Sequence, residues 1–106
     1  MVTEAILKKA VREGRVVWRR HAVERMLQRE IKQSDVKAVL VQNEQIETYP
    51  DDRPFPSALF AGTVGSRLLH VVAAVDEEAQ EVHIISAYEP DREHFDENGR
   101  TRRRRS

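Results

Sequence analysis

The sequence predicts an α+β fold in which N-terminal helices pack on one face of a four-stranded antiparallel sheet in meander order. Three observations carry this prediction. Apolar residues recur at helical spacing through the first part of the chain, and the pattern changes to that of strands after Asn43. Two β-rich apolar runs, residues 68–76 and 81–88, are joined by a short polar connection. Such a pair is typical of an antiparallel hairpin, and its near-continuous apolarity places it at the centre of the sheet.

Length and composition limit the class of protein. A chain of 106 residues is long enough for one domain, which we place at residues 1–96, followed by an Arg-rich tail at residues 97–106 that we expect to be disordered. The absence of cysteine excludes disulfides, thiolate zinc sites and a cysteine nucleophile. With neither a signal peptide nor an apolar run of membrane-spanning length, we expect a cytoplasmic protein without a membrane partner.

The net charge of zero hides a strong asymmetry along the chain. Residues 1–40 carry a net charge of +5, residues 41–99 carry −10, and residues 100–106 carry +5. A uniformly basic nucleic-acid-binding surface is therefore excluded, whereas a basic helical face combined with a basic tail is compatible with binding to nucleic acid. The alternative is that the helices are simply solvated and that the tail keeps the protein soluble.

Three helices are expected before residue 44. The first covers residues 3–13, with Thr3 as N-cap and Gly14 as the stop, and the second covers residues 21–30. The third begins at Ser34, which can cap it, and Ile31 forms the contact between the second and third helices. Residues 16–18 form a short strand or an extended entry, in which Trp18 is a core anchor.

Four strands are expected after the helices, at residues 45–49, 57–64, 68–76 and 81–88. A turn-rich loop with three prolines, residues 50–56, separates the first two strands, and Gly65 and Ser66 make a tight turn into the third.

The register of the last hairpin decides which side chains share a face. A four-residue connection pairs Asp76 with Glu81, so that paired position numbers sum to 157, and His70 then lies opposite Ala87. In that register Tyr88 points to the other face. A loop of another length, or a β-bulge, makes the sum even and puts His70 on the same face as Tyr88.

Four motifs in order resemble a known family. They are the His-Ala-x-x-Arg-Met segment at residues 21–26, residues 49–52, the Leu-His-Val-Val strand at residues 69–72 and the Ala-Tyr-x-Pro-Asp end at residues 87–91. The chain resembles the bacterial domain-of-unknown-function family 4258. The resemblance implies the fold of RelE- and BrnT-like toxins, related more distantly to barnase and colicin ribonucleases.

This resemblance implies a candidate reaction. RelE-type ribonucleases work without metal: a base removes the ribose 2′-OH proton, a cation stabilises the phosphorane, and an acid protonates the leaving 5′ oxygen. Suitable residues are present in this sequence. The catalytic candidates are His21, Arg25, His70 and Tyr88, and the binding candidates are Arg20, Arg29, Arg53, Arg67 and Glu89.

Each catalytic candidate also has a structural interpretation. His70 can be a hydrogen-bonded strand histidine, and His21 can satisfy backbone groups at a helix start. Arg25 can pair with Glu47, Asp51 or Glu89, and Tyr88 can belong to the core. We interpret His83 and His94 as incidental. The histidines lack the close helical spacing of a zinc site, so no metal and no cofactor is expected.

Two functional classes follow. The first is a toxin-like, metal-independent endoribonuclease that is held inactive by an antitoxin, which the resemblance suggests to be of zinc-finger type. The second is a non-catalytic module that keeps the same fold to bind RNA or a protein, which the acidic second half of the chain favours because it repels phosphate.

Overall fold

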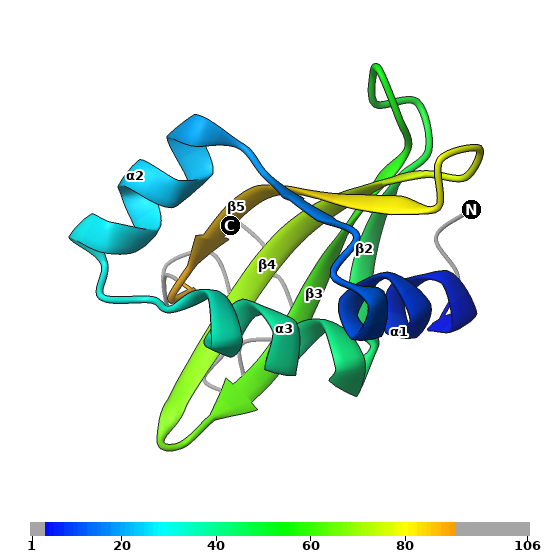
Figure 1. The fold of residues 1–106 in the computed structure, drawn as a ribbon. Helices are drawn as coiled ribbons and strands as arrows, with labels where there is room; N and C mark the ends of the chain where they lie inside the picture. Colours follow the sequence, from blue (N-terminus) through cyan, green and yellow to red (C-terminus); the bar gives the residue numbers. More distant parts are fainter. Residues whose placement is uncertain (1–3, 91–106) are drawn as a thin grey trace, which may run out of the picture.

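The computed structural model describes residues 4–90, which form three helices and five strands (Figure 1). Their bounds are α1 Glu4–Glu13, β1 Val16–Trp18, α2 Arg20–Gln28, α3 Gln33–Gln42, β2 Glu44–Tyr49, β3 Ser57–Val64, β4 Arg67–Asp76 and β5 Glu81–Tyr88. The predicted cap Thr3, His94, the end of the predicted domain at residue 96 and the predicted tail at residues 97–106 lie outside the described residues. None of the three helices has the length and apolar character needed to cross a membrane.

The sheet has five strands in the order β1-β5-β4-β3-β2. Strands β2 to β5 form the expected antiparallel meander, and β4 lies at its centre. The prediction of four strands was wrong, because β1 pairs with β5 in parallel, with Val17 opposite His83. Three residues are too few to show an alternating pattern, but their pairing covers a β5 edge that would otherwise expose unpaired backbone groups.

The helices differ from the predictions at their ends. Ser34 does not cap α3: Lys32 is the N-cap residue, and its backbone N–H donates to Asp35 Oδ2 at 2.9 Å. Helix α2 ends at Gln28, two residues earlier than expected, and Glu30 adopts a positive φ of 55° that turns the chain. This turn allows Ile31 to be buried as the predicted contact between α2 and α3.

The hydrophobic core lies between the helices and one face of the sheet (Figure 1). From β4 it takes every second residue, beginning at Leu69 and including Val71, and from β3 it takes the fully buried Phe60. The helices contribute the following residues to this core: Leu7, Ala10, Ala22, Met26, Val36, Val39 and Leu40. Residues between these positions on the strands therefore belong to the other face of the sheet.

The hairpin of β4 and β5 contains both registers that the sequence left open. Next to the turn, Asp76 pairs with Glu81, as the four-residue connection requires. A bulge between the Ala73 and Val72 pairings then inserts one extra residue, Ile85, into β5. Beyond this bulge His70 lies directly opposite Tyr88, so the two side chains share a face.

Candidate functional site

Polar side chains gather on the face of the sheet opposite the helices, which we call the polar face. Among the described residues, all three helices pack on the opposite face of the sheet, where they share the hydrophobic core. Three rows of paired positions on the polar face extend from β2 to β5. These rows are Glu44, Ala61, His70 and Tyr88; Glu47, Leu59, Val72 and Ser86; and Tyr49, Ser57, Ala74, His83 and Val17.

His70 and Tyr88 form the centre of the candidate site. Their ring centroids lie 5.6 Å apart in an edge-on arrangement with an interplanar angle of 64°. His70 is fully buried, whereas Tyr88 is half-buried. Tyr88 is therefore the more accessible of the two rings.

Tyr88 also lines a surface pocket of about 410 Å³, together with Arg29, Arg67 and Glu89. The pocket lies where β4 begins and β5 ends, beside the residues that follow α2. Two guanidinium groups, one carboxylate and one phenol converge here from three segments of the chain. Such a set can bind an anion and can exchange protons with it.

The two arginines of this pocket differ in how their donors are used. Arg67 donates from Nε to Glu89 Oε1 at 2.6 Å, and from its two terminal nitrogens to the backbone carbonyls of Glu30 and Arg29. Arg29 donates one N–H to the carbonyl of Ala87 at 2.9 Å. A guanidinium has five N–H donors, and the described residues accept only one from Arg29, so most of its fork can serve a ligand. Arg67 mainly holds the end of α2 against the sheet.

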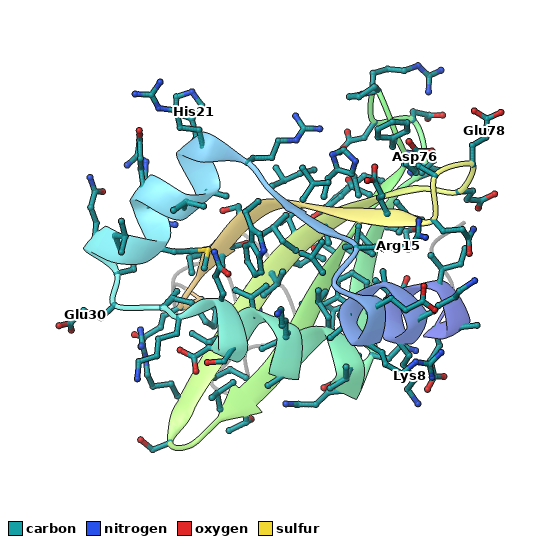
Figure 2. All side chains as sticks on the ribbon, viewed as in Figure 1. Lys8, Arg15, His21, Glu30, Asp76 and Glu78 are labelled. Carbon is teal, nitrogen blue, oxygen red and sulfur yellow. The ribbon has the colours of Figure 1, made fainter. Side chains whose placement is uncertain are left out.

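The structure brings together five of the nine residues that the sequence singled out: Arg29, Arg67, His70, Tyr88 and Glu89. Four others lie elsewhere. His21 stands at the start of α2 with 96% of its side chain exposed, pointing away from the sheet (Figure 2), and Arg20 pairs with Glu24 on the same turn. Arg25 is exposed on α2 and forms no ion pair within residues 4–90, and Arg53 is exposed in the loop after β2.

Sequence reasoning missed the acidic end of the polar face. Glu44 and Glu47 come from β2 and lie on the same face as His70, and the hydroxyl of Tyr49 donates to Glu47 Oε1. The alternation in residues 45–49 puts Glu47 and Tyr49 on one side of their strand. Only the pairing of β2 with β3, which includes a bulge between Gln45 and Glu47, shows that this side is that of His70.

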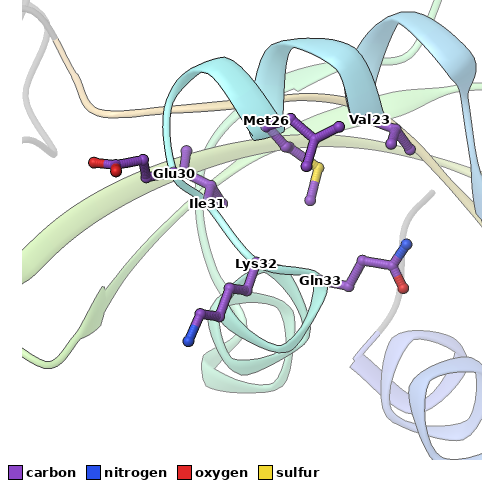
Figure 3. A pocket seen from close by; sticks show the side chains of 7 residues that line it. Val23, Met26, Glu30, Ile31, Lys32 and Gln33 are labelled. Carbon is purple, nitrogen blue, oxygen red and sulfur yellow. The ribbon is translucent and has the colours of Figure 1, made fainter.

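A second pocket of about 380 Å³ has a different character (Figure 3). It lies between α2 and the start of α3 and is mainly apolar, with Glu30, Lys32 and Gln33 at its rim. Leu27, with 73% of the residue exposed, is part of its wall. None of its lining residues among those the structure describes is a histidine or a tyrosine, so it is a less suitable place for proton-transfer chemistry than the pocket at Tyr88.

A family comparison agrees with the motifs. The model of the domain-of-unknown-function family DUF4258 matches residues 18–89, which is more than half of the chain, and the chain belongs to this family. The matched range includes His70, Tyr88 and the four residues that line the pocket at Tyr88. The comparisons with curated proteins and with solved structures found no match.

Proposed function

We propose that this protein is a toxin-like, metal-independent endoribonuclease that cleaves RNA through attack of the ribose 2′-OH. The observation that supports this proposal best is the β5 bulge, which makes His70 and Tyr88 direct neighbours. The same strand end carries a pocket with two arginines and a carboxylate. Cleavage of a phosphodiester by the 2′-OH requires such groups: a cation for the phosphate, a base for the 2′-OH and an acid for the leaving 5′ oxygen.

Each pocket residue can be given a role in that reaction. Arg29 binds the scissile phosphate with its remaining donors and stabilises the charge of the phosphorane. Glu89, with 58% of its side chain exposed, accepts the 2′-OH proton, and the Tyr88 hydroxyl donates a proton to the leaving 5′ oxygen. The bond from phosphorus to the 5′ oxygen breaks as the bond to the 2′ oxygen forms, which gives a 2′,3′-cyclic phosphate and a 5′-OH.

In this scheme His70 and Arg67 position other groups. The imidazole packs against the Tyr88 ring and fixes its orientation, and Arg67 holds Glu89 through the 2.6 Å contact. His70 is fully buried, so the group that meets the substrate is the phenol in front of it.

The direct test is RNA cleavage by the purified, folded protein with EDTA present. We expect products that end in a 2′,3′-cyclic phosphate, and a loss of about 10²–10⁴-fold in rate for Tyr88→Phe, which removes only the hydroxyl. His21→Asn is the matched control because it changes an exposed histidine outside the pocket, and it should keep the wild-type rate. Intact RNA after incubation with excess folded wild-type protein would contradict the proposal.

The partners follow from the same proposal. RNA is the substrate, and an antitoxin protein, which resemblance to the toxin superfamily suggests to be of zinc-finger type, holds the enzyme inactive in the cytoplasm. Expression of the chain alone should then arrest bacterial growth, and Tyr88→Phe should relieve the arrest. Equal growth with and without induction, at matched protein levels, would contradict this part of the proposal.

The second candidate is a non-catalytic module that binds RNA or a protein. Two observations favour it: His70 is fully buried, and each nitrogen of Arg67 already donates to a protein acceptor. This candidate predicts RNA or protein binding without cleavage, which Tyr88→Phe leaves unchanged. If the ligand is RNA, the logarithm of the affinity should fall linearly with the logarithm of the salt concentration.

A further inference from the structure

The turn end of the β4–β5 hairpin carries a second cluster of chemically active side chains, formed by Asp76, Glu81 and His83. One carboxylate oxygen from each acid and one imidazole nitrogen lie within 4.8 Å of one another. The register explains this convergence, because Asp76 and Glu81 are direct cross-strand partners and His83 lies two residues further along β5. All three side chains are half-buried on the polar face (the Asp76 end is labelled in Figure 2).

Among the described residues, no lysine or arginine neutralises the two carboxylates of this cluster, since neither Asp76 nor Glu81 forms an ion pair with such a residue. Asp76 Oδ1 accepts the backbone N–H of Ala79 at 3.2 Å, which leaves Oδ2 available. Like charges at directly opposed positions destabilise a strand pair, so a cation between these carboxylates would relieve a repulsion that the fold otherwise retains.

His83 is held so that one of its nitrogens faces the carboxylates. Only 14% of its side chain is exposed, and its Nε2 is buried, without a hydrogen bond, 3.8 Å from Glu81 Oε1. The ring of Phe55 packs on the imidazole with centroids 5.2 Å apart. On the other side, Nη2 of Arg19 lies 3.3 Å from Nδ1. The orientation of the ring is thus fixed before any ligand arrives.

We propose that Asp76, Glu81 and His83 bind a divalent first-row transition-metal ion, and we choose Zn²⁺ as the probe. Imidazole and carboxylate ligands both suit Zn²⁺, and bonds of about 2.1 Å place tetrahedral ligand atoms roughly 3.4 Å apart. The observed separations, all within 4.8 Å, shorten to this value when the acidic side chains rotate toward the ion. Water completes the coordination, and the ion links β4 to β5 across their turn.

Arg19 gives this proposal a specific signature. When Nε2 binds a metal, Nδ1 carries the remaining proton and can no longer accept a hydrogen bond from the guanidinium. Arg19 is exposed, so its side chain must move into solvent when the ion binds. Removing this side chain should therefore strengthen binding, although it is not a ligand.

The site is independent of the proposed ribonuclease chemistry. His83 pairs with Ala74, and the two acids pair with each other nearer the turn. His70 lies four residues before Ala74 on the same strand, about 13 Å away at the usual rise of a strand. A ribonuclease that works in EDTA and a hairpin that binds Zn²⁺ are therefore compatible. The two proposals can fail separately, because the first is tested by RNA cleavage and the second by Zn²⁺ binding.

The experiment is a titration of the metal-free full chain with Zn²⁺ by calorimetry, with thermal unfolding as a second readout. We expect binding of Zn²⁺ that raises Tm, weakened about tenfold or more in Glu81→Gln and His83→Asn and strengthened in Arg19→Ala. His21→Asn is the matched control and should bind as the wild type does. The proposal would be overturned if the wild type does not bind Zn²⁺. It would also be overturned if the folded Glu81→Gln and His83→Asn variants bind Zn²⁺ as tightly as the wild type does.

Discussion

The two faces of the sheet are built from alternate residues of the same strands, yet they differ in composition. Apart from Arg67 at its first position, β4 contributes only apolar residues to the helix face, among them Leu69 and Val71, and these are buried in the core. On the polar face, the same strand contributes His70 and Asp76, and its neighbours contribute Tyr88 and His83. One face of the strand thus holds the fold together, and the other presents polar side chains that belong to the two proposed sites.

This difference predicts that substitutions on the helix face reduce stability, whereas substitutions on the polar face change function. A side chain on the helix face packs into the core that all three helices share, so its removal lowers the free energy of unfolding. A polar group on the other face contributes less to packing, so its removal should alter function while the fold survives. The predictions below test this division of roles between the faces.

Among these substitutions, Phe60→Ala should lower the free energy of unfolding most. Phe60 is fully buried on the helix face of β3, and its removal leaves a cavity under the helices. We expect the free energy of unfolding to fall by about 3–5 kcal/mol, measured by urea denaturation. A loss below about 1 kcal/mol, with an unchanged m-value, would show that the helices do not depend on this face.

A matched pair on one strand sharpens the comparison. Val71 is fully buried on the helix face, and its neighbour Val72 is half-buried on the polar face. The same change, Val to Ala, should cost roughly 2–3 kcal/mol at Val71 and clearly less at Val72, because only the first leaves a cavity in a closed core. Equal losses in parallel urea titrations would mean that both faces are packed alike.

Gly62→Ala tests how closely α3 approaches the sheet. A Cβ at Gly62 would lie 2.8 Å from Gln42 Oε1 and 3.1 Å from the Cα of Val39. The amide of Gln42 also bonds the backbone of Thr63, accepting its N–H at 3.1 Å and donating to its carbonyl at 3.0 Å. We expect a loss of about 1–3 kcal/mol in unfolding free energy. Wild-type stability would show that α3 can move away without cost.

The main features of the fold could be predicted from the sequence because they depend on local patterns. The period of the apolar residues identified all three helices and four of the five strands, and Gly14 stops α1 with a φ of 73° as expected. The parallel pairing of β1 could not be predicted, since a three-residue run carries no periodicity. The start of α3 was placed at the wrong residue because Asp35, inside the helix, supplies the capping oxygen.

The candidate site was harder to predict because it depends on distant pairings. A bulge at Ile85 decides that His70 and Tyr88 share a face, and no local signal distinguishes that bulge from a regular register. Arg29 joins the pocket through a contact with the carbonyl of Ala87, 58 residues further along the chain. Conversely, the register expected at the turn already pairs Asp76 with Glu81, so the cluster with His83 was within reach of sequence reasoning.

Tyr88→Phe should have the smallest effect on stability, and it is the strictest test of the difference between the two faces. Tyr88→Phe keeps the ring that packs against His70 and removes only a hydroxyl from a half-buried side chain. The unfolding free energy should therefore change by less than about 1 kcal/mol, which is typical of a single hydrogen-bonding group. If the same variant loses RNA cleavage while its urea midpoint stays at the wild-type value, the polar face carries function rather than stability. A large loss of stability would instead assign Tyr88 to the packing of the fold, and the two faces would then differ less than their composition suggests.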